Sequence, residues 1–141
     1  MRSQPSKSEA SADAKSTILA FVEKINAHDV EGLADLMSED HLFVDSLGRV
    51  QKGREKMREG WKRYFTMFPD YHIAVSEIIE RDGTFVLIGT AGGTYGVGGR
   101  LLEENRWEVP AAWKAVISDG YVTEWRVFAD NYKTVKLLQS K

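Results

Sequence analysis

The sequence predicts an α+β domain in which a cone-shaped, curved antiparallel sheet packs on three N-terminal helices. Apolar residues recur at helical spacing in the first half of the chain, whereas Ile- and Val-rich segments fill the second half. Asp-Gly pairs separate these later segments, which is typical of β-hairpins. Three helices are too few to cover both faces of the sheet. We therefore expect one face to meet solvent or a partner subunit.

The first two helices are predicted from apolar residues at spacings of three and four. Ser16 or Asp13 can cap the first helix, which we expect to end near residues 27–28. Asp29 can cap a short second helix, because its side chain can accept a hydrogen bond from a free main-chain N–H. The apolar positions of these helices are Ile18, Leu19, Phe21, Val22 and Ile25, then Val30, Leu33, Leu36 and Met37.

A short strand over residues 41–45 and a turn over residues 46–49 are expected next. The third helix is predicted to begin after Gly53 and to run to about Phe68. Pro69 ends it, since the residue before proline is disfavoured in the helical region. The apolar face of this helix carries Met57, Trp61, Tyr64 and Phe65, and its other side is charged.

Four strands are predicted after Pro69, joined as an antiparallel meander. Asp82-Gly83 and Asp119-Gly120 are the expected hairpin turns. Gly92-Gly93 predicts a bulge or bend within the second of these strands, and residues 96–99 a flexible connection. The expected strands cover residues 71–81, 84–95, 105–117 and 121–130, and a short tail follows.

Composition excludes several classes of function. The 141 residues suit a single domain, which we expect over residues 13–141 after a disordered tail over residues 1–12. A net charge of −2 and interleaved charges argue against a nucleic-acid partner. No apolar run approaches the roughly 18 residues of a membrane span, and the N-terminus does not resemble a secretory signal. We expect no membrane partner and a cytoplasmic location.

Several strings, in order, resemble the SnoaL-like and ketosteroid isomerase-like group of the nuclear transport factor 2-like superfamily. The resemblance covers most of the chain, from about Ile18 to Asn131, and it implies a cystatin-like α+β barrel. The group includes isomerases, cyclases, dehydratases, hydrolases and non-catalytic binders, so fold alone does not give the reaction. The strings are FVEKINAHD at 21–29, HLFVDSLG at 41–48 with GRE at 53–55, GTYG at 93–96, and WKA at 113–115 through DG at 119–120 to WRVFAD at 125–130.

The resemblance places Asp45 where the isomerase branch carries its carboxylate base. A partly desolvated carboxylate at the lip of an apolar pocket would have a raised pKa and could accept a proton. The alternative is an ordinary turn residue. The tyrosine and the protonated aspartate that complete the isomerase site correspond to Phe21 and to residues 111–112, which cannot donate hydrogen bonds. Ketosteroid isomerase activity of the usual kind is therefore not expected.

Two further residues are candidate catalytic partners. Asp130 closes the last predicted strand, near the place where the hydrolase and some cyclase branches carry an acidic residue. It could instead cap the tail that follows. Tyr95 follows Gly93-Thr94, and its hydroxyl could donate to a substrate carbonyl. A core aromatic on a strand is the alternative for Tyr95.

The expected ligand is small and flat, and either apolar or aromatic, because aromatic side chains are plentiful. The three histidines lack the spacing of metal ligands, and there is no cysteine. We expect neither a metal nor a cofactor. The residues predicted to line the pocket are Phe21, Trp61, Tyr64, Phe65, Trp113, Trp125 and Val127.

Three functions fit the sequence. The first is a cofactor-independent enzyme that transfers protons on a small apolar carbonyl compound, as a cyclase, isomerase, dehydratase or hydrolase. The second is a binding module with the same pocket and no chemistry. The third is an interaction protein that uses the exposed sheet face. A homodimer through that face is expected and is compatible with all three.

Overall fold

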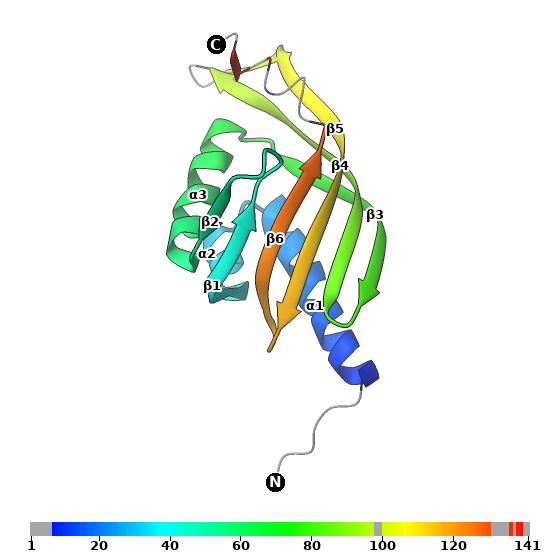
Figure 1. Ribbon diagram of the computed structural model, residues 1–141. Helices are drawn as coiled ribbons and strands as arrows, with labels where there is room; N and C mark the ends of the chain where they lie inside the picture. Colours follow the sequence, from blue (N-terminus) through cyan, green and yellow to red (C-terminus); the bar gives the residue numbers. More distant parts are fainter. Residues whose placement is uncertain (1–6, 98–99, 131–135, 137, 140–141) are drawn as a thin grey trace.

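The computed structural model describes residues 7–97, 100–130, 136 and 138–139, which form three helices and one six-stranded sheet (Figure 1). The α+β class predicted from the sequence is confirmed. The helices are α1 (Lys7–Asn26), α2 (Val30–Leu36) and α3 (Arg54–Met67). The strands are β1 (Met37–Val44), β2 (Val50–Lys52), β3 (His72–Arg81), β4 (Thr84–Val97), β5 (Arg100–Ser118) and β6 (Tyr121–Ala129).

Helix α1 begins at Lys7, inside the segment 1–12 that was expected to be a disordered tail. Asp13 and Ser16 consequently lie within the helix and do not cap its start. Alanine recurs through residues 7–16, which contain neither Gly nor Pro. The helix can therefore extend outward from its buried part at little cost in helix propensity.

The other two helices follow their predicted capping signals. Asp29 caps α2, because its carboxylate accepts a hydrogen bond of 2.9 Å from the main-chain N–H of Gly32. Helix α3 begins directly after Gly53, whose φ of 112° is accessible chiefly to glycine. It ends with Phe68 as the C-cap, so the predicted stop at Pro69 is also confirmed.

The sheet is mixed rather than wholly antiparallel. Its strand order is β2-β1-β6-β5-β4-β3, and β1 runs parallel to β6 while every other pair is antiparallel. The meander from β3 to β6 was predicted because hairpin turns lie between its strands. β1 and β6 are separated by most of the chain, so no turn sequence fixes their relative direction. Strand β2, which pairs with β1, was not predicted.

Both Asp-Gly hairpins are confirmed. Asp82 and Gly83 have φ values of 50° and 82°, and Asp119 and Gly120 have values of 52° and 81°. Positive φ at both central residues is the type I′ geometry, whose twist matches that of the flanking strands.

The predicted bulge at Gly92-Gly93 is wrong. Strands β4 and β5 stay in register through both glycines, and the shift occurs further on, between Thr94 and Gly96. A Cβ atom on Gly92 would lie 3.1 Å from the main-chain oxygen of Trp107, which is a tight contact. Glycine at this position allows β4 to approach β5 closely, which explains its presence without a bulge.

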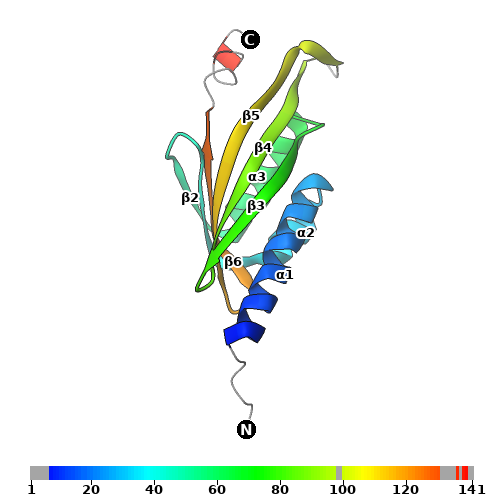
Figure 2. The same cartoon turned by 90° about the vertical axis from the view of Figure 1, so that its right-hand side faces the viewer.

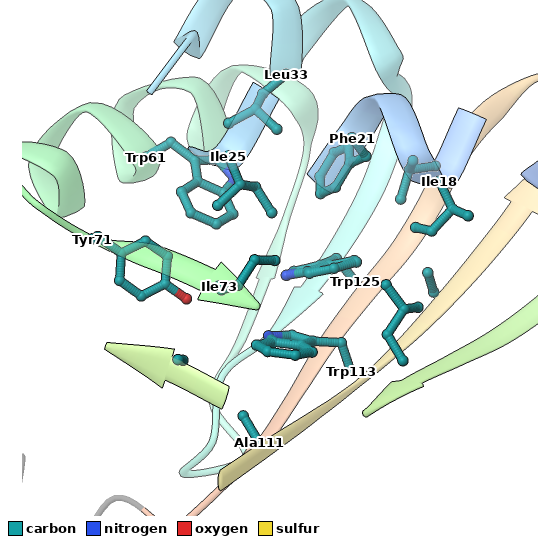
Figure 3. Packing of buried hydrophobic residues seen from close by; sticks show 14 of the residues in the cluster. Ile18, Phe21, Ile25, Leu33, Trp61, Tyr71, Ile73, Ala111, Trp113 and Trp125 are labelled. Atoms are coloured by element: carbon teal, nitrogen blue, oxygen red, sulfur yellow. The ribbon is translucent and has the colours of Figure 1, made fainter. Parts of the chain in front are cut away.

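The three helices lie on one side of the sheet, and no described element covers the other face (Figure 2). Strand β5 alternates buried and exposed residues over much of its length, with alternate side chains pointing toward the helices. The inward side chains form one hydrophobic cluster with α1 and α3, part of which is seen in Figure 3. None of the described helices is long and apolar enough to cross a membrane. The expected cytoplasmic location stays a prediction.

Candidate functional site

Four aromatic side chains that carry hydrogen-bond donors are in contact on the helix-covered face; we call them the donor cluster. Trp61 and Tyr64 come from α3, Tyr71 directly precedes β3, and Trp107 lies on the inward side of β5. The ring centroids of Trp61 and Tyr64 are 6.1 Å apart, and those of Tyr64 and Tyr71 are 4.8 Å apart. Those of Tyr71 and Trp107 are 6.1 Å apart. The four rings thus form a continuous chain of contacts.

Helix α3 presents two of these rings because of its amphipathic pattern. Met57, Trp61 and Phe65 are buried at four-residue intervals, and Tyr64 lies one turn after Trp61 on the same face. Tyr71 is held from the turn that follows α1. The ring of His28 in this turn stacks on Phe65 at 4.1 Å, and its Nε2 lies 2.7 Å from the main-chain oxygen of Tyr71. The connection between α3 and β3 is thereby fixed.

The two indole N–H donors of this cluster have no acceptor within the described part of the chain. Trp61, Tyr71 and Trp107 are 5%, 7% and 7% exposed, and the Nε1 atoms of both tryptophans are buried without an acceptor. Burial raises the pKa of Tyr64, and burial together with the neighbouring Tyr64 raises the pKa of Tyr71. Both hydroxyls therefore stay protonated. A buried donor without an acceptor costs about 1–3 kcal/mol, so two in one cluster are unusual.

The residues predicted to line a pocket gather in one interior cluster. Their role as pocket-lining residues stays a prediction. Phe21, Trp113 and Trp125 are almost fully buried and pack on one another, with centroid distances of 5.0 Å and 6.1 Å to the Trp125 ring. Phe65 belongs to the same buried cluster, and Val127 packs against it. Of the predicted set, Trp61 and Tyr64 belong to the donor cluster.

The Asp45 carboxylate makes the contacts of a turn residue. Its Oδ1 accepts hydrogen bonds of 2.9 Å from the main-chain N–H groups of both Leu47 and Arg49. Its Oδ2 lies 4.0 Å from Nε of Arg49. These contacts stabilise the turn between β1 and β2. A catalytic role for Asp45 stays a prediction.

Asp130 and Tyr95 also lie apart from Asp45. Asp130 is exposed directly after β6. Val44 pairs with Arg126 in the parallel register, so Asp130 lies three positions beyond the level of Asp45, about 10 Å along the strand. Tyr95 is half-buried near the far end of β4, and its ring contacts Phe68 at 6.1 Å. Their catalytic roles stay predictions.

The buried polar and charged residues of the described chain are His41, Thr94 and Asn105, so no described carboxylate is buried. The Nδ1 atom of His41 lies 2.6 Å from the main-chain oxygen of Val122, and its Nε2 atom is buried without a hydrogen-bond partner among the described residues. Burial lowers the pKa of His41. The described residues contain no group of three His, Cys, Asp or Glu side chains that could hold a metal.

The outer surface also carries a depression, but its side chains do not suit the binding of an apolar ligand. A shallow depression of about 520 Å³ lies on the outer surface where β2 meets α3. All of its lining side chains are exposed, and charges of both signs alternate around it. Such an open, mixed-charge surface offers little desolvation, so we place the candidate site at the donor cluster. The depression is lined by Val50, Gln51, Glu55, Lys56, Glu59 and Arg63.

Sequence reasoning missed Tyr71 and Trp107 as members of the site. Trp107 was visible only as an aromatic on a predicted strand, and its inward direction depends on the register of β5. Tyr71 was assigned to a strand, whereas it precedes β3 and turns toward α3. The residue that could have indicated the position of Tyr71 is Asn26. Its side chain accepts a hydrogen bond from the main-chain N–H of Ile73 and donates one to the main-chain oxygen of Ile73. Such a residue marks where α1 fixes the start of β3.

Comparisons with solved structures show the fold. A candidate SnoaL-like polyketide cyclase from Jannaschia sp. CCS1 matches with a TM-score of 0.79 and 16% identity, over 99% of each chain. TerC, co-crystallised with polyporic acid, matches with a TM-score of 0.74 and 20% identity, over 90% of this chain and 98% of its own.

A protein with a ketosteroid isomerase-like fold from Catenulispora acidiphila, in complex with trimethylamine, matches with a TM-score of 0.68 and 18% identity. The alignment covers 79% of this chain and 83% of that chain. No curated protein matches the sequence. The family profile of the SnoaL-like domain matches residues 18–130, which is most of the chain. With its nuclear transport factor 2-like fold, the chain belongs to the SnoaL-like domain family.

Proposed function

We propose that this protein binds a small, flat, mostly apolar molecule on the helix-covered face of its sheet, against the donor cluster. The observation that carries the proposal is the chain of four contacting rings, two of which carry buried indole N–H groups that are unpaired within the described residues. Aromatic faces provide area for a flat ligand, and a few polar groups among them can orient it.

The structural neighbours support a small-molecule role without specifying it. Several are candidate polyketide cyclases, and two were crystallised with small ligands, namely trimethylamine and polyporic acid. At 20% identity or below, this likeness extends to the fold alone. The chemistry of the ligand must therefore come from the side chains of this chain.

Cofactor-independent proton transfer on a small carbonyl compound is the second proposal, favoured by the candidate cyclases among the neighbours. Asp45, Asp130 and Tyr95 are its proposed residues. Binding is better supported, because no described carboxylate is buried and Oδ1 of Asp45 already accepts two hydrogen bonds in a turn.

Nuclear magnetic resonance can test the binding site directly. The chain has four tryptophans, so an ¹H–¹⁵N spectrum should show four indole N–H signals, each assignable by a Trp→Phe variant. Steroids, polyketide-like aromatics and terpenoid epoxides would first be screened by thermal shift, since a ligand present at 100 Kd adds about 2.7 kcal/mol of stability. A compound that binds as proposed should move the signals of Trp61 and Trp107.

The outer depression supplies the matched control. Binding there would move the main-chain amide signals of Gln51 and Glu55 and leave the Trp107 indole unchanged. That result, or the absence of any binding compound across the three classes, would overturn the proposed function.

We also propose that the uncovered sheet face pairs with the same face of a second copy. Ile88, Ala112 and Phe128 lie side by side across β4, β5 and β6, and Ile88 and Phe128 are 37% and 48% exposed. One ion pair lies beside the row, since Lys114 Nζ lies 3.0 Å from Glu124 Oε2, and the Arg126 guanidinium lies 5.0 Å from the centroid of the Phe128 ring. An apolar row beside an ion pair that is already formed within the chain suits an isologous contact.

Light scattering after size exclusion tests this pairing. The wild-type chain should have the mass of a dimer, and Phe128→Glu should give a folded monomer. Leu47→Glu is the control, because Leu47 is 53% exposed on a turn away from that row. A wild-type monomer at high concentration, or a Phe128→Glu variant that stays dimeric, would contradict the pairing.

A further inference from the structure

We infer that the free edge of β2 and the neighbouring face of α3 form a docking groove for an extended protein segment whose side chains alternate between acidic and apolar. The segment would add to the sheet as a further strand. The inference goes beyond the proposed function, because it concerns the outer surface rather than the helix-covered face of the sheet. It is carried by the hydrogen-bonding pattern of β2 and by the charges of the depression beside it.

Strand β2 is an edge strand that lies beside α3 and pairs with β1 (Figure 1). The main-chain oxygen of Arg49 and the main-chain N–H of Gly53 both make hydrogen bonds to the β1 side, at 3.0 Å and 2.7 Å. Hydrogen-bonded pairs alternate along an antiparallel ladder, so the main-chain groups of Val50 and Lys52 point away from β1. Within the described chain, no hydrogen bond occupies these outward N–H groups and oxygens. They are therefore available to an added strand.

The groove beside this edge carries more free positive than free negative charge. Lys56 and Arg63 line it from α3, and neither forms an ion pair with a described acidic residue. Of the two acidic lining residues, Glu55 is already paired at 3.0 Å with an arginine of the same helix. Glu59 is the other, and Lys52 adds a further exposed cation on β2. An acidic partner would thus gain more attraction than repulsion.

The two sides of β2 determine the pattern of the partner. A Cβ atom on Gly60 of α3 would lie 3.7 Å from the side-chain oxygen of Gln51, so the Gln51 side chain lies toward the helix. Val50 points to the other side, because successive side chains alternate along a strand, and it is 61% exposed. A partner residue opposite Gln51 would meet the charges of α3, and one opposite Val50 would cover an apolar side chain. Alternating acidic and apolar residues satisfy both positions.

Two other arrangements suit the molecule less well. Strand β3 is the second edge of the sheet, but its pairing with β4 shifts register between Val75 and Glu77, and a bulge disrupts an edge. Glu77 is also exposed there and would repel an acidic partner. A second copy of this chain on β2 would place the cations of one groove beside those of the other, which is unfavourable.

The peptide acetyl-Glu-Val-Glu-Val-Glu-amide and its analogue with lysine in place of glutamate test the charge preference. In ¹H–¹⁵N spectra of the full chain, the glutamate peptide should move the amide signals of Val50 and Lys52 downfield, because both N–H groups gain an acceptor. The lysine peptide should bind about tenfold more weakly. Arg63→Glu should weaken binding of the glutamate peptide about fivefold. Arg81→Glu is the control, because it makes the same charge change at the exposed end of β3.

N-methylated peptides test the main-chain pairing without any protein variant. In the proposed strand, the two valines lie opposite Val50 and Lys52, so their N–H groups face β2, whereas the N–H of the central glutamate faces away. Methylation of both valine nitrogens should therefore abolish the shifts. Methylation of the central glutamate nitrogen is the matched control and should leave the affinity unchanged.

Each contrary result overturns the inference. These results are an absence of shifts with the glutamate peptide at millimolar concentration, equal affinity for the glutamate and lysine peptides, undiminished binding of the valine-methylated peptide, and shifts on β3 in place of β2. Shifts on β2 that depend on protein concentration without any peptide would indicate self-association at this edge and would also overturn it. The proposed function is tested separately, because the indole signals of Trp61 and Trp107 report on it.

Discussion

Acid should destabilise this protein through one buried histidine. His41 is fully buried beside the ring of Phe21, at the place where the parallel pairing of β1 with β6 slips between Met37 and Leu42. Its Nδ1 lies 2.6 Å from the oxygen of Val122, so Nδ1 carries the proton of the neutral ring. Protonation would put a second N–H on Nε2, which is buried without an acceptor.

The sign of the pH dependence follows from the direction of the shift. Burial lowers the pKa of His41 in the folded state below its ordinary 6.5, and the weaker effects of the Val122 oxygen, Asp40 and Glu124 oppose it. Between the lowered pKa and about 6.5, the unfolded chain therefore binds more protons than the folded one. The stabilising contribution is complete above pH 6.5 and is lost as the pH falls through that window, by about 1.4 kcal/mol for each pH unit.

Urea unfolding from pH 5 to pH 8 measures this effect. His41→Asn keeps a donor near the Val122 oxygen and removes the titration, so its unfolding free energy should vary less with pH below 6.5 than that of the wild type. His72→Asn at an exposed position is the control and should follow the wild-type curve. If His41→Asn also follows the wild-type curve, the unpaired Nε2 does not control acid stability.

Three further predictions concern the elements that support the site. Asn26→Ala removes both hydrogen bonds to the start of β3 and should cost about 1–3 kcal/mol in urea unfolding; an unchanged midpoint would contradict that support. Asp45→Asn should weaken the turn by about 1 kcal/mol, and the ligand affinity measured by calorimetry should stay unchanged. A loss of affinity would instead support a role for Asp45 in ligand binding. Gly89→Ala should prevent stable folding by circular dichroism, because its Cβ would lie 1.8 Å from the oxygen of Ala74, while Gly60→Ala within α3 should be tolerated.

Local sequence signals predicted much of the fold because each depended on a few neighbouring residues. The Asp-Gly turns need only two residues with positive φ, and the Asp29 cap needs only a side chain and a nearby N–H. The parallel pairing of β1 with β6 depends on contacts between distant segments. The position of a bulge also depends on how the neighbouring strand pairs. The Gly92-Gly93 pair alone therefore predicted a bulge at the wrong position.

The candidate site was harder to predict because the direction of each side chain depends on register. Asp45 follows a strand at the predicted place, yet nearby main-chain N–H groups occupy its carboxylate. Trp107 faces inward because β5 keeps its alternation through the paired glycines of β4. The sequence indicated an aromatic interior, but only the packing shows which donors lack acceptors.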